Sequence, residues 1–463
     1  MSSTVLPPEV LHMVFEQLTN HSDFHALCQV SRHFYAIAIR FLYRRLKIPS
    51  GKGSLTAPLH AVLTPTQQES LLGYGCLHEG ELSGCGEFVR EFEVGDDGEF
   101  VGEFAVGDAA NGGIYSTNGE IIEAAVENMP RLQSFVYTIL FTHCYHTSPK
   151  PIERGITNTA RDRWNTSEIQ RSRRISASLT EKPRLRSLTL GNLVGEGDAP
   201  LLRLHPLHSF TCTLESDFVS FAHRRTPAAD YDVVRGILRN SAGTLKALGL
   251  HSVLSLRRQY EDEGLLFGAK GDPEAVKLTA LKSLSLSNRL FTSKGVKILL
   301  RAIDFANLRR LDIIGCRDSD VLLQALLQEP LRLVQLRISA TESAIGPFLR
   351  SFTGLRELWY EQETAATDWT LPGGRRRIVE TNCLTPAVAD ALGTHGSTLK
   401  KLTVKASGNG KPVVLDISTI VQLLQRFQGL TELRCSLTSF PHLVRLLLNP
   451  ISVYGVSVLI GGE

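Results

Sequence analysis

The chain has 463 residues, too many for one compact core, and its length favours several domains or an extended repeat array. Hydrophobic residues make up 43% and charged residues 21%, close to the averages of globular proteins, so global disorder is not expected. The net charge of +3, from 50 basic and 47 acidic residues, is too balanced to indicate nucleic-acid binding and favours protein partners.

The cysteines and the hydropathy indicate a compartment. Eight cysteines are scattered without a C-x-x-C pair, as a reducing environment permits, and we expect free thiols. The N-terminus lacks the cationic start and apolar core of a secretory signal, and no uninterrupted apolar run approaches ~20 residues. We therefore expect no membrane association and a location in the cytoplasm, the nucleus or both.

Residues 6–46 carry apolar side chains at helical spacing and predict several short helices. Pro7 and Pro8 suit the first turn of a helix, where a missing N–H costs nothing. After a polar turn, Ser22 or Asp23 can cap a second helix. The apolar positions of the two helices are Val10, Leu11, Val14, Phe15 and Leu18, then Phe24, Leu27, Val30 and Phe34.

A bundle of this size is marginally stable alone, because so short a chain buries little of its surface. Large apolar side chains that stay partly exposed could be buried in a partner, which favours a docking role. The alternative is a helical cap on the segment that follows.

The same residues resemble the F-box family, whose pattern is Leu-Pro-x-Glu, an apolar helix, an acidic turn and a Val-Cys/Ser-Arg/Lys-x-Trp/Phe stretch. The chain has Leu-Pro-Pro-Glu at 6–9 and Val-Ser-Arg-His-Phe at 30–34. It departs from the pattern at Phe24-His25, where an aliphatic pair is usual, and at Phe34, where tryptophan is commonest. The resemblance implies contacts with a Skp-family adaptor from Leu6, Pro7, Leu11, Phe15, Leu18, Leu27, Val30 and Phe34.

Residues 49–118 are rich in glycine and acidic residues and contain a tandem near-copy, GEFVREFEVGDD at 86–97 and GEFVGEFAVGDA at 98–109. Phe and Val alternate with charged or small residues, which predicts a hairpin or two adjacent strands. A metal site at the acidic residues is the alternative, although the calcium-loop spacing is missing.

One phrase, Leu-x-x-Leu-x-Leu or a close variant, returns from residue 132 onward. Copies at 281, 308, 333 and 355 lie 27, 25 and 22 residues apart, a spacing typical of leucine-rich repeats. Two inward leucines per short strand are buried when the next strand stacks alongside. The copies are 132–137, 185–190, 207–212, 245–250, 281–286, 308–313, 333–338, 355–360, 399–404 and 430–435.

Segments between these strands carry apolar residues at helical spacing and predict outer helices, at 230–238, 294–303, 321–327, 344–352, 386–392 and 417–427. The predicted fold is therefore α/β, a small helical domain followed by a degenerate leucine-rich-repeat solenoid with a curved parallel sheet inside and helices outside. It resembles the leucine-rich-repeat class of F-box proteins. The expected domains are 1–48 (helical), 49–118 (linker and strand insertion) and 119–463 (solenoid), with a basic polar insertion, expected to be a mobile loop, at about 141–184.

Residues that alternate with the inward leucines point to the other face of the predicted sheet. Early strands present small polar groups there, and later strands present charged residues and Trp359. Because Arg and Trp often dominate interfaces, this face is a candidate for binding a protein substrate, unless a loop covers Trp359. The candidate residues are Arg310, Asp312, Arg337, Trp359, Lys401 and Arg434.

The usual catalytic and phosphate-loop signatures are missing, and His143-Cys144-Tyr145-His146 is short of a fourth zinc ligand. No enzymatic activity, cofactor or metal is expected. The resemblance implies a substrate receptor that links a Skp-family adaptor, and through it a cullin-RING ubiquitin ligase, to a protein substrate. The alternatives are a repeat scaffold whose F-box assembles a complex without directing ubiquitination and, third, a regulator of a small GTPase.

Overall fold

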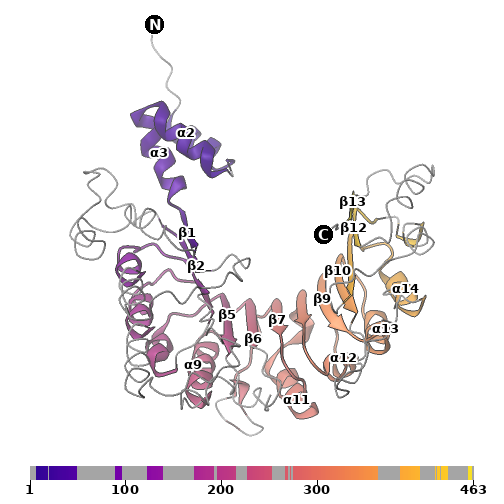
Figure 1. Ribbon diagram of the computed structural model, residues 1–463. Coiled ribbons are helices and arrows are strands. Elements are labelled where there is room, and N and C mark those ends of the chain that lie inside the picture. Colours follow the sequence, from indigo (N-terminus) through magenta and orange to yellow (C-terminus); the bar gives the residue numbers. More distant parts are fainter. Residues whose placement is uncertain are drawn as a thin grey trace, which may run out of the picture. The chain divides into compact units, whose positions relative to one another are not determined.

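The structure is a computed structural model of residues 1–463, shown in Figure 1. Among the residues that it describes, no helix is long and apolar enough to cross a membrane. The described residues are 7–18, 20–49, 89–95, 122–138, 172–191, 195–214, 227–252, 266–268, 272, 275–362, 386–406, 423, 425–427, 429–435 and 457–460.

Three short helices form the N-terminal helical domain, α1 (Pro8–Phe15), α2 (His21–Val30) and α3 (Arg32–Leu42). Pro8 is the first residue of α1, as predicted, whereas Pro7 is the N-cap residue before it. The predicted caps of the second helix were wrong, because the side chain of Asn20 accepts the hydrogen bond from the Ser22 N–H at 3.1 Å.

The second predicted helix is also divided in two. Ser31 adopts an extended backbone and accepts a hydrogen bond from the Phe34 N–H at 3.2 Å, so it ends α2 and caps α3. Phe34 therefore belongs to α3 rather than to the helix that carries Phe24 and Leu27. The spacing of apolar residues could not predict this break, because the helical spacing continues on both sides of Ser31.

Aromatic side chains form the centre of this domain. Phe15, Phe24 and Ala38 are buried, one from each helix. The Phe15 ring centroid lies 5.7 Å from that of Phe34 and 6.2 Å from that of Phe41, and the Phe24 and Phe41 rings stack at 5.6 Å. The three helices thus share one aromatic core.

The chain divides into two compact units, residues 1–215 with 219–241, and residues 216–218 with 242–463. In the first unit, the strands that follow the helical domain pair in parallel and in chain order. They are β1 (Arg45–Pro49), β2 (Glu91–Gly95), β3 (Ser134–Thr138), β4 (Ser187–Leu190) and β5 (Ser209–Leu214).

Strand β2 corrects the predicted hairpin. It contains residues of the first near-copy, but it pairs in parallel with β1 on one side and with β3 on the other, so both of its edges are occupied. Alternation of period two fits parallel and antiparallel strands equally, and the sequence could not separate them. The second near-copy, 98–109, lies outside the described residues, and the sheet begins at Arg45 rather than at the expected residue 119.

Helices of the first unit include residues 122–127, residues 172–180 and α9 (Pro227–Asn240). The second of these corrects the expectation of a loop at the end of the basic insertion. Ile175 and Leu179 are buried, and Asp198 accepts hydrogen bonds from the hydroxyls of Ser172 and Ser176 at 2.5 and 2.8 Å. Two apolar side chains one turn apart are enough to pack this helix despite the arginines around it.

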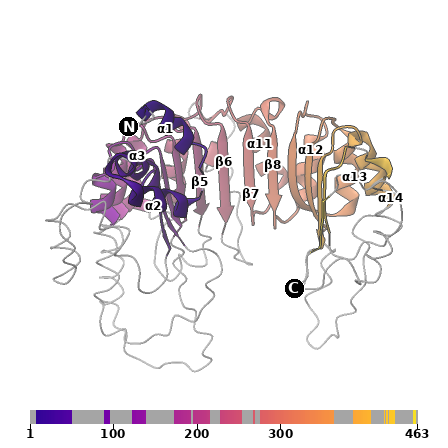
Figure 2. The ribbon, with the colours of Figure 1, turned by 90° about the horizontal axis from the view of Figure 1, so that it is seen from above.

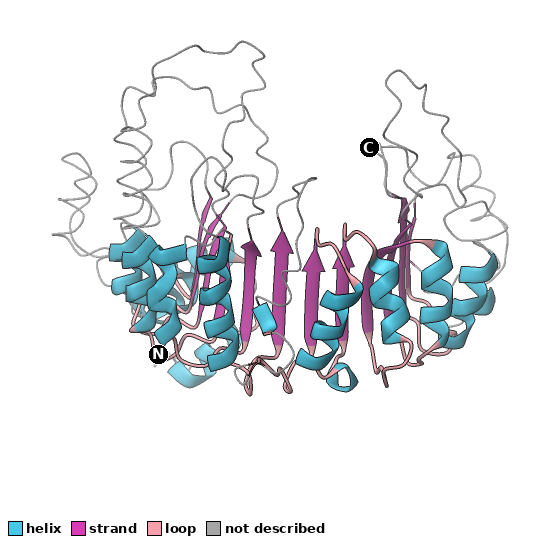
Figure 3. Ribbon diagram, turned by 90° about the horizontal axis from the view of Figure 1, so that it is seen from below, coloured by secondary structure: helices cyan, strands magenta, loops and turns pink. Residues whose placement is uncertain are grey.

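The strands predicted from the leucine phrases are observed in both units. All ten leucine phrases of the chain contain strands, and each strand begins two residues after the first leucine of its phrase. Figure 3 shows neighbouring strands within each unit lying side by side. The strands of the second unit are β6 (Ala247–Ser252), β7 (Ser283–Ser287), β8 (Arg310–Ile314), β9 (Gln335–Ala340), β10 (Glu357–Gln362), β11 (Lys401–Ala406), β12 (Glu432–Cys435) and β13 (Ser457–Ile460), paired in parallel in this order.

The helices of the second unit lie along one face of its sheet, as Figure 2 shows for α11, α12 and α13. Leucines of the strands, such as Leu311, Leu336 and Leu358, are buried under them. Of the predicted helix 417–427, the described residues 423, 425 and 426 are helical. The helices are α11 (Ser293–Ala302), α12 (Ser319–Leu326), α13 (Glu342–Arg350) and α14 (Pro386–Leu392), with short 3-10 turns at Phe305–Asn307 and Gly393–His395.

His395 is fully buried between α13 and the start of β10. Its Nδ1 accepts a hydrogen bond from the Leu355 N–H at 3.4 Å, so its Nε2 carries the proton and donates to the Leu349 carbonyl at 3.0 Å. Burial lowers the pKa of His395, although the Leu349 carbonyl opposes this shift. The folded chain therefore holds the neutral imidazole.

We expect acid to destabilise the second unit through His395. Because the pKa of His395 is lower in the folded than in the unfolded chain, its contribution to the free energy of unfolding is complete above about pH 6.5. Below that pH the unfolded chain binds the proton more readily, and the stability falls by at most about 1.4 kcal/mol per pH unit. Urea unfolding at several pH values should show a weaker pH dependence in His395→Gln than in the wild type. The matched change at the exposed His208 should leave the slope unaltered, and equal slopes in all three proteins would contradict this assignment.

Candidate functional site

One face of α1 is apolar and exposed. Val10, Met13 and Val14 expose 40%, 66% and 50% of their surface, and Pro7 is exposed one turn before Val10. Spacings of three and four residues bring these side chains together on the helix. We call Pro7, Val10, Met13 and Val14 the α1 apolar face.

The residues predicted to contact an adaptor are distributed differently. Leu11 and Phe15 are buried inside the helical domain, and Phe15 exposes 1% of its surface. Val30, at the end of α2, exposes 64%, and Pro7 is also exposed. Leu6 lies outside the described residues, and the half-buried members of the set are Leu18, Leu27 and Phe34, which pack against the aromatic core.

The apolar positions of α1 thus serve two purposes. Leu11 and Phe15 hold the domain together, while Val10, Met13 and Val14 stay exposed. Sequence reasoning did not place these three among the contacts. A signal was present, because Val10, Leu11, Met13, Val14 and Phe15 surround more of the helix than one buried stripe requires. A cluster of exposed apolar side chains on a small domain marks an interaction site.

A second candidate surface is the face of the second unit's sheet opposite the helices. We call it the strand face, and it carries the outward side chains of the strands. Parallel pairing places outward residues of successive strands in rows. One row contains Arg310, Gln335, Glu357, Lys401 and Glu432, and the next contains Asp312, Arg337, Trp359, Thr403 and Arg434.

Most charges on the strand face are neutralised within it. Arg310 donates to the buried Asp312 carboxylate at 2.8 Å, and this hydrogen bond raises the pKa of Arg310. The Lys401 ammonium lies 3.4 Å from the Glu357 carboxylate. Arg434 pairs with Glu432 along its own strand. Asp312 and Arg310 therefore stabilise each other, and Asp312 is not available to a ligand in this conformation.

Arg337 differs from these cations. Its guanidinium carbon lies 4.5 Å from the centroid of a Trp359 ring, and Arg337 is exposed while Trp359 is half-buried. Within the described part of the chain, the Arg337 side chain makes no ion pair or hydrogen bond. A stacked guanidinium keeps its N–H groups directed outward along the plane of the fork, where they can bind a carboxylate.

Four of the six candidate residues thus form two neighbouring pairs on this face. Arg310 lies beside Asp312 on β8, and Arg337 on β9 lies beside Trp359 on β10. Lys401 and Arg434 lie on β11 and β12, farther along the same face. Contact with a substrate remains a prediction for all six. Among the described residues there is no group of three or more His, Cys, Asp and Glu side chains that could hold a metal, and 143–146 lie outside them.

Comparison with known families agrees with the N-terminal assignment. Residues 4–49 match the family model described as F-box-like. No curated protein matches the chain by sequence. The matched range spans α1, α2, α3 and β1, and therefore includes both the aromatic core and the α1 apolar face. The chain carries an N-terminal F-box-like domain followed by a parallel sheet with helices.

Proposed function

We propose that this protein is a non-catalytic substrate-recognition subunit of a cullin-RING ubiquitin ligase, acting in the cytoplasm or nucleus. Its F-box-like domain binds a Skp-family adaptor, and its leucine-rich-repeat units bind the protein to be ubiquitinated. The observation that carries the proposal is the F-box-like match at residues 4–49 together with the exposed α1 apolar face. The chain would supply proximity, holding a substrate near ubiquitin that other subunits activate.

Energetics indicate how the α1 apolar face contributes. Complete burial of a valine or methionine side chain stabilises a complex by about 1.5–3 kcal/mol, less where the side chain is already half-buried. Association itself costs at least about 4 kcal/mol. Val10, Met13 and Val14 can therefore anchor an interface, but a stable complex needs further contacts, for which Pro7 and Val30 are exposed in the same domain.

The substrate part of the proposal is supported by the strand face. Arg and Trp are the residue types that contribute most often to binding hot spots, and here they form a stacked pair. The neighbouring ion pairs, Arg310 with Asp312 and Lys401 with Glu357, would surround that pair with polar groups that already have partners. In such an interface the neighbouring ion pairs need no new partners, whereas the Arg337 guanidinium would bind a carboxylate of the substrate.

The test places a charge on the α1 apolar face. Co-expression of the full chain with a Skp-family adaptor should give a complex whose affinity falls at least about 30-fold in Met13→Asp/Val14→Asp, because two interface side chains become costly to desolvate. The control is Ala36→Asp, at an exposed position of α3. Its helical signal and adaptor binding should match the wild type.

The result that would overturn adaptor docking through this face is equal adaptor binding by the wild type and the double variant. Circular dichroism of both proteins must accompany the binding measurement, because a loss of binding supports the proposal only if the double variant is folded. If Met13→Asp/Val14→Asp unfolds the domain, Met13→Gln keeps the test valid, since it removes apolar surface at the most exposed of the three positions without adding a charge.

A further inference from the structure

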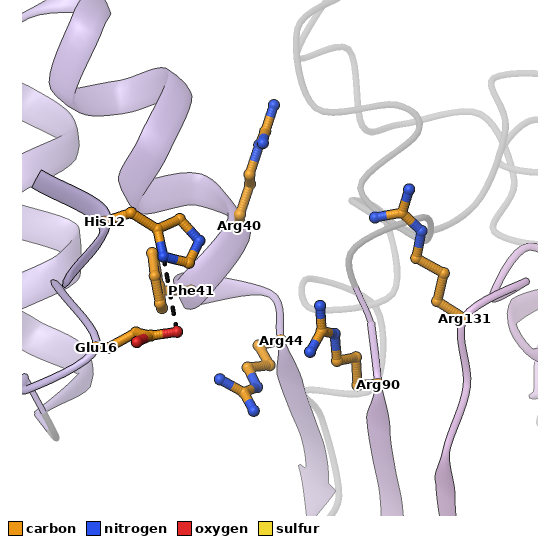
Figure 4. A pocket seen from close by; sticks show the side chains of 7 residues that line it. All are labelled: His12, Glu16, Arg40, Phe41, Arg44, Arg90 and Arg131. Atoms are coloured by element: carbon orange, nitrogen blue, oxygen red, sulfur yellow. Dashed lines mark ion pairs between the residues drawn. The ribbon is translucent and has the colours of Figure 1, made fainter. Parts of the chain in front are cut away.

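A basic pocket lies where the helical domain meets the first strands of the same unit. Four arginines line it, together with His12, Glu16 and the ring of Phe41, and its volume is 130 Å³. Figure 4 shows Arg40 on the helical side of this space and Arg44, Arg90 and Arg131 on three further chain segments around it. We call Arg40, Arg44, Arg90 and Arg131 the arginine pocket.

The backbone of the repeat brings these residues together from distant parts of the sequence. Arg44 and Arg90 directly precede β1 and β2, and the Arg90 N–H donates to the Arg44 carbonyl at 2.9 Å. The Arg90 carbonyl in turn accepts from the Gln133 N–H at 2.8 Å, which places the segment before β3, with Arg131, next in line. Arg40 comes from α3. The positions of the cations are therefore set by strand pairing and not by flexible loops.

Two acidic side chains lie near the arginines. Glu16 lies 3.6 Å from His12, with which it pairs when that histidine is protonated, and Glu91 receives a 2.6 Å hydrogen bond from Arg45. In the described part of the chain, the side chains of Arg44, Arg90 and Arg131 make no hydrogen bond or ion pair. With His12 neutral, four arginines and one glutamate give the pocket a formal charge of +3. Guanidinium groups gathered in this way repel one another unless an anion lies between them.

We propose that the arginine pocket binds a small anion that carries two phosphate groups. The planar fork of arginine donates two parallel hydrogen bonds to phosphate oxygens, and the forks of Arg44, Arg90 and Arg131 have no partner among the described residues. One phosphate monoester carries about −1.5 to −2 charges, less than the charge of the pocket, whereas two phosphates match it. The volume of 130 Å³ is below the roughly 300 Å³ at which pockets begin to enclose drug-sized ligands. It suits the phosphates themselves, with any organic group outside.

Binding would also have a mechanical consequence. The pocket residues belong to α1, α3 and the segments before β1, β2 and β3, so one anion would hydrogen-bond to the helical domain and to the sheet of the first unit together. The ligand would stabilise the junction between them. This role does not depend on the proposed ubiquitin-ligase function.

The test measures inorganic pyrophosphate binding to the full chain by isothermal titration calorimetry at constant ionic strength. Wild type should bind pyrophosphate more tightly than inorganic phosphate, and Arg90→Gln/Arg131→Gln should weaken pyrophosphate binding about 100-fold, or roughly tenfold for each lost charge-assisted contact. Arg184→Gln/Arg203→Gln makes the same charge change at two exposed positions of the same unit outside the pocket, and should bind as wild type does.

Two results would overturn the proposal. One is no pyrophosphate binding by the wild type at millimolar concentration, and the other is equal binding by the wild type and the double variant. Adaptor co-purification and circular dichroism of each variant separate a binding defect from misfolding. If the double variant misfolds, Arg131→Gln alone, at an exposed side chain, should still weaken pyrophosphate binding about tenfold.

Discussion

Replacing Phe15 by alanine is expected to unfold the F-box-like domain and to abolish adaptor binding. The Phe15 ring is buried at the centre of the domain and lies against Phe34 and Phe41. Truncation of a buried phenylalanine to alanine costs about 3–5 kcal/mol, from lost burial and from the cavity left behind. A domain of three short helices has a stability of about that size, so the loss leaves little or no folded population.

The neighbouring Val14→Ala change is the control for Phe15→Ala. Val14 is half exposed, and its truncation should change the stability of the domain by less than about 0.5 kcal/mol. Hydrogen exchange of the α1 to α3 amides measures both effects directly, because the domain is a small part of the chain and global unfolding would not report on it. Native protection of α2 and α3 in Phe15→Ala would show that the residue is a surface contact and not a core residue.

The repeat strands could be predicted from the sequence because each phrase places two large apolar side chains on one side of six residues. Leu188 and Leu190, or Leu358 and Tyr360, are two residues apart and point to the same face when the backbone is extended, where they are buried. The phrase also fixes the position of the strand within it. The apolar spacing also predicted the outer helices. Helix α14 begins and ends at the predicted residues, and the ends of α9, α11, α12 and α13 differ from the predicted ones by one to three residues.

Two strands that lack the phrase, β1 and β13, were not predicted. Residues of β1 (RLKIP) and β13 (SVLI) are too few and too varied to predict a strand, and their pairing depends on neighbours far away in sequence. For β2 the strand was predicted but not its partners, because partner choice depends on chain topology. Spacing along one strand contains no information on which strand lies beside it.

The candidate sites show a similar limit. The F-box pattern identified the domain, but not which of its apolar residues are exposed, because Leu11 and Val14 are equally apolar and only packing separates them. The ion pair between Arg310 and Asp312, two of the candidate substrate contacts, was not predicted, although outward side chains two residues apart on a strand lie on the same face. The arginine pocket could not be predicted, because its four residues come from segments that only strand pairing brings together.

Replacing Phe348 by alanine is expected to destabilise the second unit by about 3–5 kcal/mol. Phe348 is fully buried on α13, and its ring lies 5.4 Å from that of Phe352, which in turn contacts the buried His395 at 5.0 Å. In a stacked repeat each element contacts mainly its neighbours, so the loss should be largest near the cavity. Amides of β9, β10 and α14 should lose protection from hydrogen exchange more than those of β7, which is three strands from β10.

Lys297→Ala provides the matched control for Phe348→Ala. Lys297 is exposed on α11, and its truncation should change stability by no more than about 0.5 kcal/mol. A uniform loss of protection across β6 to β12 in Phe348→Ala would mean that the unit unfolds as one cooperative body, and would contradict the repeat-by-repeat stability inferred from its stacking. Arg337 and Trp359 lie on β9 and β10, the strands next to α13 in the chain. A graded loss of protection centred on α13 would therefore show that the strand face can change locally around these two residues while the more distant strands stay folded.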